Sequence, residues 1–166
     1  MTQKKYELLK NDTITAPNGK TLYRIKSLIN FGVVVAGSLG GYIEKEDNLA
    51  HSGNAWVYGN AQVYGNARVY GNARVSGNAQ VSGDAQVSGN DDLVWFSNVG
   101  TEQGTLTVYK SKDGSLLATR GCFNGTVDEF LAKSAKVHNE RIKREYRLLI
   151  EVAKSRLLGE SYVPTF

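Results

Sequence analysis

A six-residue repeat occupies the middle of this chain. Six consecutive hexapeptides, from Gly53 to Ser88, follow the template Gly-Asn-Ala-x-Val-Tyr/Ser, and Asp84 is the one departure from its fixed positions, in place of asparagine. A six-residue period fits neither the 3.6-residue period of a helix nor the two-residue alternation of a half-buried strand. It is typical of a chain wound into three-sided coils, with one short strand and one turn on each side.

The repeat also predicts which residues stack on one another. Three hexapeptides complete one coil, so residues 18 apart in the sequence are expected to lie one above the other, with layers about 4.8 Å apart. We expect alanine and valine to point inward, and glycine and asparagine to form the corners because both tolerate left-handed backbone. Outside, Trp56 should lie under Arg74, and an exposed ring of tyrosines should surround one layer: Tyr58, Tyr64 and Tyr70.

The repeat resembles a known family. Valine followed four residues later by alanine, as in Val57 to Ala61, resembles the motif of the hexapeptide-repeat proteins that form a left-handed parallel β-helix. The resemblance implies the left hand, because the general rule for strand crossovers favours the right hand. It also implies a homotrimer with parallel axes, in which the tyrosines would contribute to the oligomer interface.

The segments on either side of the repeat predict a mainly β protein in three parts. Residues 1–31 read as an N-terminal β cap, with a hairpin turn at Pro17-Asn-Gly19. Residues 32–92 read as the β-helix, whose irregular first coil would place Val35, Leu39, Ile43 and Leu49 inward. Residues 93–166 read as a β-hairpin, formed by 105–110 and 115–120, followed by a two-helix module.

Thr126-Val-Asp-Glu129 has the pattern of a capping box and should begin the first helix. The second should begin near Glu140, with apolar residues at helical spacing on one face.

Positive charge is concentrated near the C-terminal end of the sequence. The net charge is +4, and between Lys133 and Arg156 there are eight basic and three acidic residues. Such a segment is either a solvated helix face or a surface that attracts anions. We expect an anionic ligand to be surrounded by Arg120, Lys133, Lys136, Arg141, Lys143, Arg144 and Arg147. A second candidate site combines Trp56, Arg68 and Arg74, with the indole stacking on a base and the guanidinium groups binding phosphate.

Catalytic and metal-binding signals are weak. Many hexapeptide-repeat proteins are acyltransferases with a histidine general base, and His51 is the residue that would serve here. The regular coils contain no histidine, so we expect no catalytic residue and keep the His51 acyltransferase as the alternative. Two histidines and one cysteine are too few for a structural zinc site within one chain, and we expect no metal and no cofactor. Cys122 is expected to be a buried or half-buried thiol.

The segments Thr21-Leu-Tyr-Arg-Ile25, Gly53-Asn-Ala-Trp-Val-Tyr58 and Arg120-Gly-Cys-Phe123 also resemble proteins commonly encoded by phages and prophages. That resemblance implies an accessory or immune-evasion factor. We therefore expect a non-enzymatic oligomeric protein that sequesters an anionic nucleotide-type ligand or binds a host protein, with nucleic acid as a further candidate partner. A structural assembly module is the third reading. One cysteine, no signal peptide and no membrane-spanning run favour the cytoplasm, that of the host if a phage encodes the protein.

Overall fold

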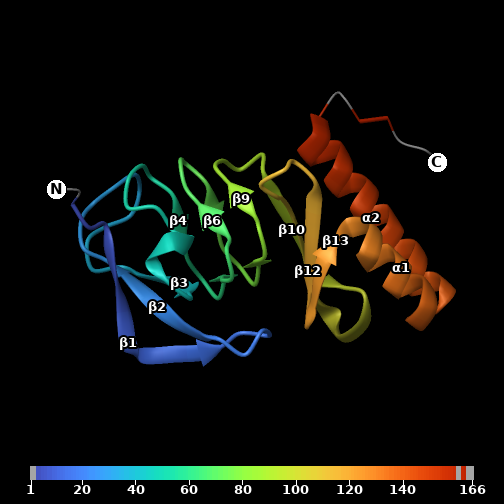
Figure 1. The fold of residues 1–166 in the computed structure, drawn as a ribbon, viewed down its shortest axis with the longest axis horizontal. Coiled ribbons are helices and arrows are strands. Elements are labelled where there is room, and N and C mark those ends of the chain that lie inside the picture. Colours follow the sequence, from blue (N-terminus) through green and yellow to red (C-terminus); the bar gives the residue numbers. More distant parts are fainter. Residues whose placement is uncertain (1–2, 160–161, 164–166) are drawn as a thin grey trace.

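The computed structural model describes residues 3–159 and 162–163. The protein is mainly β structure, with two helices at its C-terminal end. Figure 1 shows the order along the long axis: an N-terminal hairpin, a stack of coils, an antiparallel sheet, and then the helices. The core follows the same division, because one buried cluster lies inside the coils and another lies between the sheet and the helices.

The regular repeat forms six strands of two residues each. These are β4 (Trp56–Val57), β5 (Gln62–Val63), β6 (Arg68–Val69), β7 (Arg74–Val75), β8 (Gln80–Val81) and β9 (Gln86–Val87). They pair in parallel as β4 with β7, β5 with β8 and β6 with β9, so Trp56 is opposite Arg74 and Arg68 is opposite Gln86. The expected 18-residue stacking is therefore confirmed. The repeat valines and alanines are all buried and at most 1% exposed.

Glycine alone provides the left-handed corners. The repeat glycines from Gly53 to Gly83 have φ between 61° and 73°, whereas the asparagines that follow them do not have positive φ. The expectation that asparagine shares this conformation is therefore wrong. Close stacking adds a second constraint at Gly71, where a Cβ atom would lie 2.4 Å from the carbonyl oxygen of Ser88.

The N-terminal segment extends one stack of the coils. β1 (Tyr6–Thr15) and β2 (Thr21–Ser27) form the expected antiparallel hairpin, with Gly19 at φ 84° in its turn. β2 then pairs with β3 (Leu39–Ile43), which lies parallel to β5, so one sheet runs in the order β1-β2-β3-β5-β8. The inward positions expected at Ile43 and Leu49 are confirmed, but Val35 and Leu39 are exposed.

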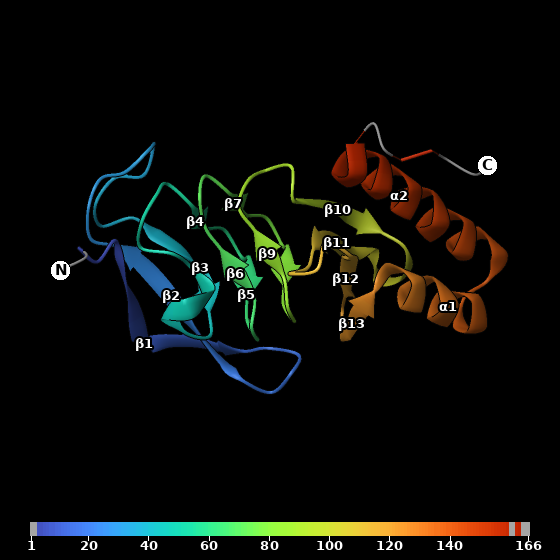
Figure 2. The ribbon, with the colours of Figure 1, turned by 45° about the horizontal axis from the view of Figure 1, so that its top comes forward.

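A four-stranded antiparallel sheet follows the last coil. Its strands lie in chain order: β10 (Leu93–Val99), β11 (Gly104–Lys110), β12 (Leu116–Arg120) and β13 (Phe123–Thr126). The expected hairpin is β11 and β12, whereas no strand was expected where β13 lies, between this hairpin and the first helix. Leu93 and Tyr109 belong to the core of the coils, and Leu106 and Val108 belong to the core under the helices. The sheet thus separates the two cores (Figure 2).

Two helices cover the far face of this sheet. α1 (Val127–Val137) begins with the expected capping box, in which Thr126 Oγ1 accepts from the Glu129 amide and Glu129 Oε1 accepts from the Thr126 amide. α2 (Glu140–Leu158) begins after Asn139, whose side chain accepts from the Ile142 amide. Its buried residues keep helical spacing: Ile142, Tyr146, Ile150, Ala153 and Leu157. Two short 3-10 turns complete the fold, η1 (Glu46–Asn48) and η2 (Thr101–Gln103).

Candidate functional site

The predicted ligand-binding residues lie in three separate places. Arg120 and Lys133 line a cleft between the C-terminal sheet and α1. Arg68 lies on the face formed by β6 and β9, whereas Trp56 and Arg74 lie on the face formed by β4 and β7. The remaining basic residues of the predicted set do not line the cleft: Lys136, Arg141, Lys143, Arg144 and Arg147.

The cleft that contains Arg120 and Lys133 has a volume of about 220 Å³. We call it the Arg120–Lys133 cleft. Arg120 ends β12, and Lys133 lies on α1, the next helix along the chain. The lining also includes Thr101, Glu102, Gly121, Cys122, Phe123, Phe130, Ser134, Val137, His138 and Tyr146.

Arg120 is held in place by the loop that includes η2. Its Nη2 atom donates to the carbonyl oxygen of Thr101. Gly104 permits this packing, because a Cβ atom there would lie 2.4 Å from the guanidinium carbon. Within the described residues, the buried Nε atom of Arg120 has no hydrogen-bond partner. The guanidinium group is therefore fixed in position by its Nη2 contact, and its buried Nε is not exposed to the cleft.

Aromatic rings form the floor of the cleft. The Lys133 ammonium lies over the Phe123 ring, 5.5 Å from its centroid. The Phe123 and Phe130 centroids are 5.4 Å apart, and those of Phe130 and Tyr146 are 4.8 Å apart. The cleft therefore combines two cations with a floor of aromatic rings that pack at tilted and edge-on angles.

His138 and Cys122 also belong to the cleft. His138 Nδ1 lies 2.8 Å from the Ser134 hydroxyl, one helical turn back on α1. Cys122 is exposed, so the expectation of a buried or half-buried thiol is wrong. Each of the two residues follows a basic residue closely in the sequence. It is the fold of β12, β13 and α1 that brings Cys122 and His138 into one cleft.

The basic residues outside the cleft form a solvated surface. Lys136, Arg141, Arg144 and Arg147 are exposed, and Lys143 is paired with Glu140 at 3.1 Å. Of the seven cations predicted to surround a ligand, two therefore line the cleft and five do not.

The second predicted site does not assemble. Trp56 is 3% exposed and packs edge-on against Phe31 and Tyr6, with centroids 5.2 and 6.4 Å away. Arg74 lies opposite Trp56 in the strand register, but its guanidinium is over the Tyr58 ring at 5.7 Å. An exposed Trp56 that stacks with a ligand beside Arg74 and Arg68 is thus contradicted, because the N-terminal segment covers the indole.

The predicted tyrosine ring is uneven. Tyr70 is 39% exposed and Tyr58 is half-buried, but Tyr64 is 2% exposed. Tyr64 packs with Ala16, Leu22 and Tyr42 of the N-terminal sheet. Burial raises the pKa of Tyr64. The expectation of three exposed tyrosines is therefore wrong for Tyr64.

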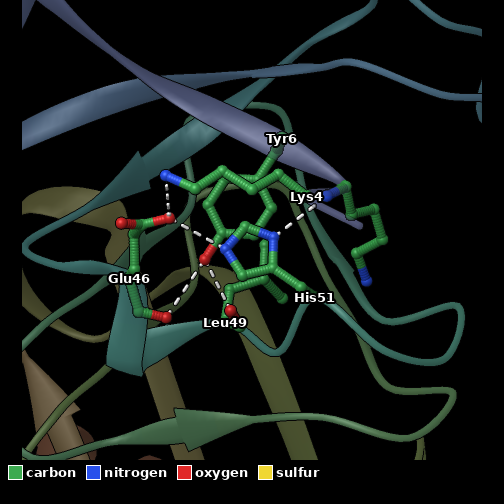
Figure 3. Close-up of polar contacts among 6 residues, drawn as sticks. Lys4, Tyr6, Glu46, Leu49 and His51 are labelled. Carbon is green, nitrogen blue, oxygen red and sulfur yellow. Dashed lines mark hydrogen bonds and ion pairs between the residues drawn. The ribbon is translucent and has the colours of Figure 1, made fainter. Parts of the chain in front are cut away.

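His51 joins the first strand to the first coil (Figure 3). Its Nδ1 atom accepts a hydrogen bond from the Lys5 amide at 3.0 Å, and its Nε2 atom lies 2.9 Å from Glu46 Oε1. The ring stacks on Tyr6, with centroids 4.2 Å apart. The hydrogen bond from His51 is the main cause that lowers the pKa of Glu46.

These contacts fix the tautomer of the His51 imidazole. The Lys5 amide occupies the lone pair of Nδ1, so the neutral ring carries its proton on Nε2 and donates it to Glu46. A general base needs a free lone pair directed at the substrate. The geometry of His51 is therefore that of a structural contact.

Comparisons with known proteins identify the repeat. A family described as the YdcK beta solenoid repeat matches residues 61–77 and 67–83. This match lies within the regular hexapeptides and indicates a β-solenoid repeat. No curated protein matches the chain. In the described part of the chain, no helix is long and apolar enough to cross a membrane, and no group of three or more His, Cys, Asp or Glu residues could hold a metal ion.

Proposed function

We propose that the protein is a non-enzymatic binding protein that holds a small phosphate-bearing ligand of the nucleotide type in the Arg120–Lys133 cleft. The observation that carries the proposal is the convergence of these two cations beside the Phe123 ring. Among the described residues neither cation takes part in an ion pair. An anion would therefore bind without displacing an existing carboxylate partner.

The chemistry of the cleft suits a phosphate attached to a ring. A guanidinium group donates hydrogen bonds to phosphate oxygens, and an ammonium group adds a compact charge. The Phe123 ring offers a face for a base. Since about 220 Å³ is small for a ligand pocket, the ligand would be a mononucleotide or smaller and would leave part of itself in solvent.

The proposal extends to the assembly and the setting of the protein. Left-handed coils and a homotrimer are supported by the likeness of the repeat to hexapeptide-repeat proteins and by the exposed Tyr70 ring. An anti-defence role in the host cytoplasm is supported by the likeness to phage-encoded proteins. In that role the protein would sequester a nucleotide signal and leave it unchanged.

Three other functions remain as alternatives. An acyltransferase based on His51 is disfavoured by the engagement of both ring nitrogens. A purely structural assembly module would need no cleft with unpaired cations. A host protein would instead bind over the Arg120–Lys133 cleft, without a bound small molecule.

Native mass spectrometry of freshly purified protein tests stoichiometry and ligand together. We expect a trimer mass with a small phosphate-bearing molecule bound, recovered unchanged after denaturation. A monomer mass would contradict the assembly, and a chemically altered ligand would indicate an enzyme.

Calorimetric titration with a panel of nucleotides tests the cleft itself. We expect Lys133→Gln to weaken binding at least tenfold, about 1.4 kcal/mol, because one of two phosphate contacts is lost. Lys136→Gln is the matched control, since Lys136 lies on the same helix outside the cleft, and it should leave affinity unchanged. Absence of binding by every nucleotide, or an equal effect of both variants, would contradict the proposal.

A further inference from the structure

The three faces of the coils carry the same repeat but are covered differently. The outward position that follows valine is buried on the β5–β8 face, at Tyr64, and half-buried on the β4–β7 face, at Tyr58. On the β6–β9 face the corresponding residue, Tyr70, is exposed, and so is Arg68 two residues earlier. The β6–β9 face is therefore the one of the three whose repeat side chains are most open to solvent.

This face is concave. One depression of about 370 Å³ is lined by Lys45, Arg68, Asp84 and Lys112, among others. A neighbouring depression of about 410 Å³ contains Tyr70. Both include Asp47, Arg68 and Gln86, so they are continuous. We call this surface the β6–β9 groove and define it by six residues: Lys45, Asp47, Arg68, Tyr70, Asp84 and Lys112.

The cations of the groove are positioned by their backbones, and none of them takes part in an ion pair within the described residues. The Lys112 amide donates to the Asp84 carbonyl oxygen at 2.8 Å, which attaches the β11–β12 turn to the last coil. The Lys45 amide donates to Asn48 Oδ1 at 3.0 Å. No ion pair within the described residues involves Lys45, Arg68 or Lys112. Three elements thus bring three available cations to one depression.

The groove also has acceptors for hydroxyl groups. Asp84 stands where the other repeats have asparagine, and it lines the groove together with Asp47 and Gln86, whose side chain ends in an amide group. Carboxylates accept hydrogen bonds and an amide group both donates and accepts. A simple anion would use the cations and be repelled by the carboxylates, whereas a ligand with an anionic group and several hydroxyl groups would use both.

We propose that the β6–β9 groove binds a small polyhydroxylated anion, a sugar phosphate or a sugar acid. Its anionic group contacts Arg68, Lys45 and Lys112, and its hydroxyl groups donate to Asp47 and Asp84. The exposed Tyr70 ring offers an apolar face to the sugar ring. The groove is a site separate from the Arg120–Lys133 cleft, because the two share no lining residue.

The repeat itself supplies variants that keep the fold. Arg68→Gln places in the groove the residue that occupies the same repeat position at Gln62, Gln80 and Gln86, and Tyr70→Ser does the same with reference to Ser76, Ser82 and Ser88. Arg74→Gln is the matched control, because it makes the same change on the β4–β7 face. Unchanged thermal melts of the three variants would show that affinity differences arise from the groove.

Calorimetric titration should use glucose 6-phosphate, glucuronate, inorganic phosphate and glucose as probes. We expect at least one of the first two to bind, at least tenfold more tightly than inorganic phosphate or glucose; which of the two binds identifies the anionic group. Arg68→Gln should weaken binding at least tenfold and Tyr70→Ser about threefold, whereas Arg74→Gln and Lys133→Gln should have no effect. The proposal is wrong if neither sugar anion binds, if inorganic phosphate binds as tightly, or if Arg74→Gln has the effect of Arg68→Gln. Loss of nucleotide binding in Lys133→Gln would leave this result unaffected, so the two proposals fail independently.

Discussion

The two ends of the coil stack are closed in different ways. At the N-terminal end, the equivalent carbonyl oxygens of Ala55, Ala61 and Ala67 accept hydrogen bonds from three different groups: the Lys5 ammonium, the Tyr42 amide and the Asn48 side chain. At the C-terminal end, a complete sheet lies over the last coil. There the Gln80 amide donates to Thr107 Oγ1, the Ser82 amide donates to Tyr109 OH, and the Ser88 amide donates to Asp92 Oδ2.

The difference concerns how stability is distributed. At the N-terminal end, two buried polar side chains each satisfy several backbone groups, so each loss leaves several groups without a partner. At the C-terminal end, each side chain satisfies one or two groups, and Leu93 and Tyr109 add apolar contact with the coils. Unpartnered buried polar groups are destabilising by about 1–3 kcal/mol each. We therefore expect single substitutions to be more damaging at the N-terminal end.

Asn48→Ala should give the largest effect. The Asn48 side chain is fully buried; its Oδ1 accepts from the Glu44 and Lys45 amides, and its Nδ2 donates to the Gly65 and Ala67 carbonyl oxygens. We expect the free energy of unfolding to fall by about 3 kcal/mol, measured by urea denaturation. Asn72→Ala, at an exposed corner, is the control and should change it by less than about 0.5 kcal/mol. Equal effects would remove the contrast between buried and corner asparagines.

Lys5 should make the free energy of unfolding depend on pH in the alkaline range. Lys5 is 1% exposed, and burial lowers the pKa of its ammonium group to about 8. Between this value and the unfolded value of 10.5, the unfolded chain binds more protons, so stability should rise with pH. The expected gain from pH 8 to pH 10 is about 2 kcal/mol.

Burial raises the pKa of Tyr6 above its usual value, and Glu46 and Asp47 add to the shift. The folded state therefore retains the Tyr6 proton to higher pH, and the stabilisation that comes from the protonated Tyr6 is lost above about pH 10.

The difference in the free energy of unfolding between the wild type and Lys5→Met, measured by urea denaturation across pH 8–10, isolates the contribution of the lysine. A constant difference across that range would contradict the lowered pKa.

Tyr109→Phe should give the smallest effect, at the C-terminal end. The Tyr109 hydroxyl accepts from the Ser82 amide at 3.2 Å and lies 3.4 Å from Ser82 Oγ. Removing it leaves one buried amide without this partner while the ring keeps its packing, so we expect a loss of about 1 kcal/mol. Tyr58→Phe is the control. A loss larger than that of Asn48→Ala would reverse the comparison between the two ends.

The repeat made the inside of the coils predictable. A fixed period determines which residues face inward and which stack, so the strand pairs and the buried valines follow directly from the sequence. The helices were predictable for a similar reason, since the capping box and the apolar spacing are local. β13 was missed because Phe123-Asn-Gly-Thr126 has little strand propensity of its own and forms by pairing with β12.

The outside of the coils was less predictable, because distant segments cover it. Tyr58, Tyr64 and Tyr70 are equivalent in the repeat, and only the N-terminal sheet makes Tyr64 buried. The contact of His51 with the Lys5 amide joins residues 46 apart in the sequence. The hydrogen bonds of the His51 ring nitrogens therefore could not be inferred from the neighbouring residues. Of the predicted cations, Arg120 and Lys133 converge because β13 turns the chain back between them.

The 18-residue register also limits how a chain of this kind can change length. The pairing of Trp56 with Arg74 and of Arg68 with Gln86 defines layers that repeat after one full coil. Adding a whole coil would move everything beyond it along the axis by about 4.8 Å, and each face would keep its alignment. Adding a single hexapeptide would instead rotate the C-terminal sheet by about a third of a turn. Lys112 would then leave the face that carries Arg68, and the groove would lose one of its three cations.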